Sequence, residues 1–235
     1  MNPSGAAYRT RHARGATLAT HRHRAPYAAL VLDGDYTESS LDGPLPCRPG
    51  TLVLHPAYHA HGDRFGGLGA SAVNIELTEV GFDLSASAWQ VHDLREAVEV
   101  FERCPQRLSE LLACASPQAA AEPPDWQGEL LRRMADSEQD IALLARGLGV
   151  SAEHASRALS RSYGMSPRAL RREARWRRAL NLLGGALPLA EVAVAAGFAD
   201  QSHLHRVVVA HAGCTPARLR RQIKCVQDRA IGAAA

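Results

Sequence analysis

The sequence predicts an α+β protein of two domains: an N-terminal β-barrel with a short helical segment, and a C-terminal all-α domain containing two helix-turn-helix units. In the first half, short apolar runs alternate with turns, which is typical of an all-β sandwich or barrel. In the second half, one pattern is written twice. The length of 235 residues also suggests two modest domains, since domains commonly have ~100–200 residues.

The strand signals follow an N-terminal tail. Residues 1–14 mix Arg, Gly and Ala, and we expect them to include a frayed end, with organised sequence starting at Gly15. The pair Gly34-Asp35 predicts a turn after the first strand. The strands predicted from apolar runs are residues 27–32, 51–54 and 72–77.

A histidine-bearing pattern lies in this strand region. It reads Gly15-x5-His21-x-His23-x3-Tyr27-x6-Gly34, and Pro49-Gly50, Pro56 and His61 follow it. These two segments resemble the signatures of the cupin family, small β-barrels in which they bring histidines to one metal ion. The resemblance implies a cupin-like barrel in which the metal ligands are His21, His23 and His61, with His59 as a rival for the third position.

The residue types qualify this metal site. His21 and His23 point to one face of a strand because side chains alternate. Tyr27 stands where metal-binding cupins carry a glutamate, and a phenol with a pKa near ~10 is a poor ligand, so we assign Tyr27 to the effector pocket. Three histidines suit zinc, nickel or copper and leave a fourth position open. The alternative is a barrel without metal whose histidines hydrogen-bond each other or a ligand.

A helical segment is predicted after the barrel, between Asp93 and Cys114. Pro105 divides it into two helices. Its apolar stripe packs either on its own sheet or on a second protomer; the first is the more common arrangement, and the second favours a homodimer. The stripe consists of Leu94, Val98, Phe101, Leu108 and Leu112.

The charge is divided unevenly between the two halves. Residues 1–136 carry 12 basic and 17 acidic side chains, whereas residues 137–235 carry 15 and 7. A basic module joined to a mildly acidic one favours polyanion binding by the basic part. The predicted boundaries are residues 1–112 for the cupin-like effector and dimerisation domain, 113–127 for a linker, and 128–235 for the DNA-binding domain.

The repeated pattern predicts two helix-turn-helix units. Each copy has a short apolar helix with a small packed residue, Ala145 or Ala193, then a glycine that can adopt positive φ and a polar-faced helix. Ser166-Pro167 and Thr215-Pro216 predict an N-cap and a first-turn proline of the next helix. The helix from Pro167 to Leu183 is predicted to be a rigid spacer between the copies.

The last hundred residues resemble the AraC-type transcription regulators. The resemblance depends on Ala193-x3-Gly197-Phe198-x-Asp200-Gln201-Ser202-His203, followed by Arg206 and Gly213-x-Thr215-Pro216. It implies that the spacer holds two reading helices in successive major grooves of one duplex, about one turn (~34 Å) apart. We expect base or phosphate contacts from the exposed start of each reading helix. The predicted DNA-binding residues are Ala152, Glu153, Ser156, Arg157, Arg161, Gln201, Ser202, His205 and Arg206. Arg168, Arg171 and Arg172 are further candidates for phosphate contacts.

We therefore expect a sequence-specific transcriptional regulator that binds double-stranded DNA as a homodimer and senses a small molecule or metal ion through its cupin-like domain. It is not expected to be an enzyme. No apolar run reaches membrane-spanning length, so we expect a cytoplasmic protein with no membrane partner. One alternative is a metal-dependent cupin enzyme with a DNA-binding appendage. The other is a constitutive DNA-binding protein whose barrel only dimerises.

Overall fold

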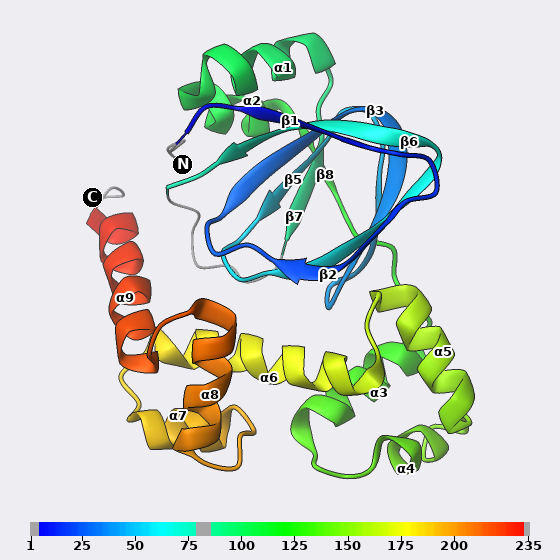
Figure 1. The fold of residues 1–235 in the computed structure, drawn as a ribbon, viewed down its shortest axis with the longest axis vertical. Coiled ribbons are helices and arrows are strands. Elements are labelled where there is room, and N and C mark those ends of the chain that lie inside the picture. Colours follow the sequence, from blue (N-terminus) through cyan, green and yellow to red (C-terminus); the bar gives the residue numbers. More distant parts are fainter. Residues whose placement is uncertain (1–4, 79–85, 233–235) are drawn as a thin grey trace. The chain divides into compact units, whose positions relative to one another are not determined.

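The computed structural model describes residues 5–78 and 86–232 and divides into two compact units, Met1–Glu122 and Pro123–Ala235 (Figure 1). The first is built on a β-sheet and the second is helical, so the predicted α+β class is confirmed. The region predicted as a linker, residues 113–127, is partly ordered into both units. Ser116–Gln118 forms the last strand of the sheet, and the first helix of the second unit begins at Asp125.

The first unit contains one antiparallel sheet whose hydrogen-bonded order is β1-β6-β3-β5-β7-β8, with β2 on β6 and β4 on β3. Because this order does not return to its starting strand within the described residues, the predicted barrel is an open sheet. The long strands β3 and β6 pair along most of their length and carry the shorter strands on either side. The strands are β1 (Tyr8–His12), β2 (Thr17–Arg22), β3 (Tyr27–Ser40), β4 (Gly43–Cys47), β5 (Thr51–His55), β6 (Ala60–Glu76), β7 (Ser87–Gln90) and β8 (Ser116–Gln118).

Two local predictions in this unit were wrong. Organised structure begins before Gly15, because Tyr8–His12 forms strand β1, in which Tyr8 pairs with Asn74 and His12 with Ala70 on β6. The expected turn at Gly34 is an irregularity within β3. Gly34 has a φ of 73°, and a Cβ there would overlap the carbonyl oxygen of Gly69, itself at a φ of 71°. The glycine therefore allows two strands to approach closely and does not reverse the chain.

The helical segment packs on its own sheet. It consists of α1 (Leu94–Arg103), a 3₁₀ turn (Pro105–Arg107) and α2 (Leu108–Cys114), so the predicted break at Pro105 is confirmed. Phe101 and Leu108 are buried with sheet residues such as Leu30 and Ile75, and the other members of the predicted stripe pack around them. The stripe therefore packs on its own sheet, as the intramolecular alternative predicted.

The second unit is arranged along one long helix. Figure 1 shows α6 running from the group α3, α4 and α5 to the group α7, α8 and α9. The helix α6 contacts α3, α5, α7 and α9. Its bounds are those predicted for the spacer, Pro167–Leu183. The other helices are α3 (Asp125–Asp136), α4 (Ile141–Arg146), α5 (Ala152–Tyr163), α7 (Leu189–Ala195), α8 (Gln201–Ala212) and α9 (Pro216–Gly232). No helix within the described ranges is both long and apolar enough to cross a membrane.

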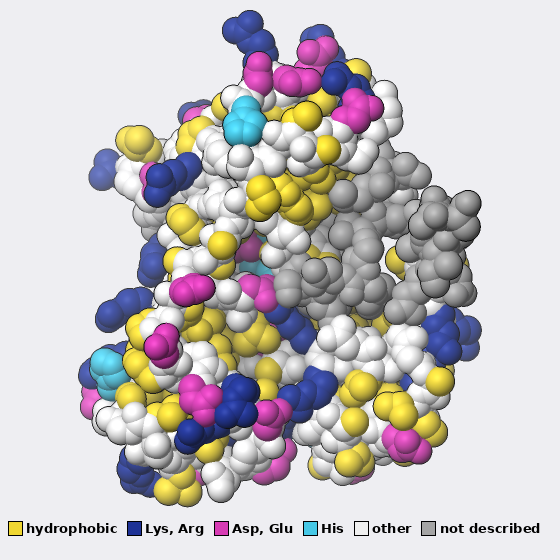
Figure 2. Space-filling model, turned by 180° about the vertical axis from the view of Figure 1, so that it is seen from behind, with side chains coloured by type: hydrophobic (Ala, Val, Ile, Leu, Met, Phe, Trp, Pro, Cys, Tyr) yellow, Lys and Arg dark blue, Asp and Glu magenta, His cyan; other side chains and the backbone are white. Residues whose placement is uncertain are grey.

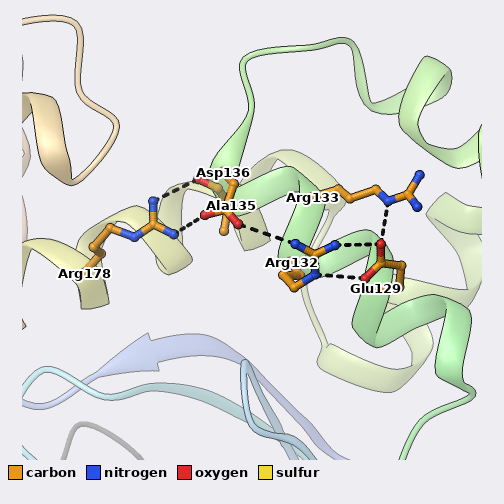
Figure 3. A network of polar contacts seen from close by, with 6 residues as sticks. All are labelled: Glu129, Arg132, Arg133, Ala135, Asp136 and Arg178. Atoms are coloured by element: carbon orange, nitrogen blue, oxygen red, sulfur yellow. Dashed lines mark hydrogen bonds and ion pairs between the residues drawn. The ribbon is translucent and has the colours of Figure 1, made fainter.

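A polar network fastens the end of α3 to α6 (Figure 3). Arg178 donates to Asp136 at 2.5 Å and to the carbonyl oxygen of Ala135 at 3.3 Å. Within α3, Glu129 accepts from both Arg132 and Arg133. Since the C-terminal carbonyls of a helix carry partial negative charge, a guanidinium there is favourable. The network therefore fixes the angle at which α3 meets the spacer.

Candidate functional site

The two helix-turn-helix units are capped in the same way. The hydroxyl of Ser151 accepts from the backbone N–H of His154 at the start of α5, and the carboxylate of Asp200 accepts from that of His203 at the start of α8. Both helices have 12 residues and end at a left-handed glycine, Gly164 or Gly213. The repeat seen in the sequence is therefore a repeat of local structure.

The turns also match. Gly149 and Gly197 adopt φ values of 72° and 85°, a region that residues with a Cβ rarely occupy. The small residues Ala145 and Ala193 are fully buried at the helix crossings. Each copy thus brings its first helix close against its reading helix.

We expect the two N-caps to contribute equally to stability. Replacing Ser151 or Asp200 by alanine should lower the free energy of unfolding by about 1 kcal/mol each, because one helix N–H loses its acceptor. Denaturant unfolding followed by circular dichroism measures this. Ser160→Ala is the control, since Ser160 is exposed within α5 and should change stability by less than ~0.5 kcal/mol. An unchanged stability in both cap variants would contradict the assignment.

The predicted DNA-contacting residues lie on the outer faces of α5 and α8. Leu159 on α5 and Leu204 and Val208 on α8 are fully buried, as expected of core residues. Arg157 is 64% exposed and forms an ion pair with Glu153 at 2.6 Å, so Glu153 restrains the arginine. The exposed set is Ala152, Glu153, Ser156, Arg157, Arg161, Gln201, Ser202, His205 and Arg206. Their contact with DNA stays a prediction.

One of the further phosphate candidates has a structural role. Arg171 on α6 donates to the backbone carbonyl oxygens of Met134 at 3.1 Å and Gln139 at 2.7 Å. Its guanidinium therefore holds the segment after α3 against the spacer. Arg168 and Arg172 are exposed. On the face seen in Figure 2, Lys and Arg side chains lie among Asp and Glu side chains and do not form one continuous patch.

Comparison with known families identifies the helical unit. Residues 144–222, which include both helix-turn-helix copies and the spacer, match a family described as "Helix-turn-helix domain". The chain carries a helix-turn-helix domain of the AraC type. The AraC-type domain occupies the part of the chain that its repeated motif predicted.

The chain is also similar to solved structures. ToxT from Vibrio cholerae is 10% identical over 92% of this chain and 98% of its own, with a TM-score of 0.42. The C-terminal domain of AraT, a response regulator from Geobacillus stearothermophilus, is 21% identical over 43% of this chain and 88% of its own, with a TM-score of 0.40. No curated protein matches the sequence.

In the sheet unit, the three predicted metal ligands converge. His21 on β2 lies opposite His61 on β6 in the strand register. The ring centroid of His21 lies 4.5 Å from that of His61 and 5.0 Å from that of His23. One ligand atom from each residue lies within 4.8 Å of the others. We call His21, His23 and His61 the outer set.

A second group lies beside the outer set. Glu38 on β3, His55 on β5, and His59 and His61 also bring one ligand atom each within 4.8 Å of one another, and all four residues are buried. We call these four residues the buried set. His59, the predicted rival, belongs to this set and not to the outer one.

Sequence reasoning missed Glu38 and His55. The spacing His55-x3-His59-x-His61 was visible in the sequence and could have indicated a cluster at the turn between two strands. Glu38 was hidden by the mistaken turn at Gly34, because the strand continues to Ser40. Glu38 lies opposite Asp63 on β6. This pairing can be recognised only when the full length of β3 is known.

Tyr27 joins the two sets. Its hydroxyl and Nε2 of His61 are hydrogen-bonded at 3.0 Å. Its ring stacks on that of His55, with centroids 4.4 Å apart and planes at 12°. Burial raises the pKa of Tyr27 well above its usual value, so the phenol stays neutral. Its contacts therefore orient the two histidines His55 and His61.

Burial shifts the pKa values of the buried acids and histidines toward their neutral forms. It lowers the pKa of His55 and His61 well below the usual value, and neighbouring histidines lower both further. Burial, with Asp63 and Asp42 nearby, raises the pKa of Glu38 well above its usual value. In Asp63, burial raises the carboxyl pKa to about 6, although His21 acts in the opposite direction. His55 and His61 are thus neutral at pH 7, the form that binds metal ions.

A cavity of about 190 Å³ opens beside these residues. It is lined by histidines from both sets and by Tyr27, together with apolar residues such as Leu18 and Phe65. Among the described residues, Nδ1 of His55, Nδ1 of His61 and Oδ1 of Asp63 are buried without a hydrogen-bond partner. Since buried polar atoms are normally bonded, these atoms make the cavity a candidate ligand site.

Proposed function

We propose that the chain is a sequence-specific DNA-binding transcriptional regulator whose sheet unit binds an effector in the histidine-lined cavity. The observation that supports DNA reading is the pair of equally capped helices, α5 and α8, on the common spacer α6. At about 1.5 Å per residue, the 17 residues of α6 span roughly 25 Å. The two reading helices belong to the helix groups at the opposite ends of this spacer (Figure 1), an arrangement that suits entry into neighbouring turns of one major groove.

The side chains on the reading helices suit base recognition. Arg157 and Arg206 can each donate two hydrogen bonds to a guanine, and Gln201 can bond an adenine through both its donor and its acceptor. The carboxylate of Glu153 opposes phosphate but can accept from a cytosine amine. These residues are exposed and therefore need no rearrangement of the core to contact DNA.

The cavity suits a small effector. Its volume and mixed polar and apolar lining fit a small molecule or a hydrated metal ion. Such a ligand changes DNA binding only if it prefers one state of the protein. We further propose a homodimer. The enzymatic alternative gains no support from residues 144–222, which form a DNA-binding module.

The test is selection of duplexes from a random-sequence pool by the full chain, followed by titration of the selected site and a scrambled site at several salt concentrations. We expect at least ~10³-fold preference for the selected site at physiological salt. Affinity should fall linearly with salt on logarithmic axes as counterions are released. Equal affinity for both duplexes at every salt concentration would overturn the regulatory proposal.

A further inference from the structure

We propose that the buried set, Glu38, His55, His59 and His61, binds one zinc ion through four protein ligands. This site differs from the outer set implied by the cupin resemblance, because only His61 belongs to both. As an effector site it rests on the proposed function, but metal binding itself does not depend on DNA binding. Four ligand atoms within 4.8 Å of one another are the number that a closed zinc site requires.

The separation of Glu38 and His55 fits a shared ion better than a direct bond. Oε2 of Glu38 and Nε2 of His55 lie 3.4 Å apart, which is long for a charge-assisted hydrogen bond. Two ligands of a tetrahedral zinc ion with bonds of ~2.0–2.2 Å lie about 3.4 Å from each other. The two side chains are 2% and 3% exposed, so bulk solvent does not reach them.

Neighbouring groups hold the ligands in place. Nε2 of His59 is hydrogen-bonded to the carboxylate of Asp42 at 3.0 Å, and a carboxylate partner of this kind fixes the proton on Nε2 and directs the lone pair of Nδ1 to a metal. The ring of Tyr27 stacks on His55. The turn carrying His59 is fixed at Tyr58, which has a φ of 65° and donates its backbone N–H to the carbonyl oxygen of His23 at 2.7 Å.

The buried set has two advantages over the outer set. It contains a carboxylate, so the bound dication is partly neutralised, whereas the outer set offers three neutral rings. Glu38 thus supplies from the far end of β3 the acidic ligand that is missing at Tyr27. The outer set includes His23, which is exposed, and an exposed ligand gives a looser site. With four protein ligands no coordination position stays open, which argues for sensing or structural use and against catalysis.

The test is zinc titration of the chelator-treated full chain, read by equilibrium dialysis and metal analysis. The wild type should bind one zinc per chain. Glu38→Gln and His55→Gln should each weaken binding at least ~10–100-fold, whereas His23→Gln, the control from the outer set, should change it less than about threefold. Loss of binding in His23→Gln but not in His55→Gln would overturn the buried site in favour of the outer one. Absence of stoichiometric zinc in the wild type would also overturn it.

Cobalt provides a reading that does not depend on the variants folding. The wild-type protein loaded with Co²⁺ should show the intense visible absorption of a tetrahedral site; the weak bands of six-coordinate cobalt would contradict a closed four-ligand site. Titration of the selected duplex with and without zinc separates the two proposals. Specific DNA binding without zinc binding removes the zinc site alone. Zinc binding without any DNA preference leaves the site and removes its role as an effector site of a regulator.

Discussion

Replacing Arg157 and Arg206 together by alanine should reduce affinity for the selected duplex ~10²–10⁴-fold. Each arginine lies on the exposed face of one reading helix, and the loss of a bidentate base contact costs about 1–3 kcal/mol. The two sites are separated by α6, so the two losses should add. Affinity for the scrambled duplex should fall much less, because that binding depends mainly on phosphate contacts.

The control must remove the same charge. Arg95 and Arg103 are both exposed on α1 of the first unit, so the double variant Arg95→Ala/Arg103→Ala lowers the net charge equally without touching a reading helix. It should bind the selected duplex within about threefold of the wild type. If both double variants lose affinity equally, the effect is one of net charge, and α5 and α8 do not read bases.

The helical unit was predictable because its signals are local. Ser151 caps α5 and Gly164 ends it within one short stretch of sequence, and Pro167 starts the next helix immediately afterwards. Such signals depend on the backbone of the nearest four residues. Both copies carry them, so each supported the other. Even the bounds of the spacer could be read from Pro167 and the glycine after Leu183.

The sheet unit was less predictable because its geometry depends on distant pairings. Gly34 has the composition of a turn, but its conformation is set by Gly69, which lies 35 positions away on β6. Strand β1 reads Tyr-Arg-Thr-Arg-His, which contains no apolar run, and it is stabilised by pairing with β6.

The same limitation explains the incomplete metal site. The outer set was found because two of its members are two residues apart in the sequence and the third lies in a recognisable second segment. In the structure only His21 of this pair is on β2, since the strand ends at Arg22. Glu38 and His55 come from two different strands, β3 and β5. Sequence spacing carries no information on their separation. It depends on the course of β3, which pairs with β5 before its register irregularities and with β4 after them.

Replacing Trp176 by alanine should destabilise the helical unit by about 3–5 kcal/mol, the usual cost of emptying a large core site. Trp176 lies in the middle of α6 with no exposed surface, and its ring contacts that of His211 from α8, with centroids 4.9 Å apart. The substitution therefore removes packing between the spacer and the second reading helix. Affinity for the selected duplex should fall as well, since the two helices are no longer held at a fixed separation.

Denaturant unfolding measures this loss of stability. It should be followed by far-ultraviolet circular dichroism, because tryptophan fluorescence changes when a tryptophan is removed. Trp126→Ala is the matched control, because Trp126 on α3 is only partly buried and contacts His154 at a ring separation of 5.6 Å. It should cost much less than Trp176→Ala. If α6 is a rigid spacer, both helix-turn-helix copies pack on it, and Trp176→Ala should lower the stability of both copies. A variant in which the second copy melts early while the first keeps its wild-type stability would show that α6 is a flexible connection, and the fixed spacing required for reading two successive grooves would be lost.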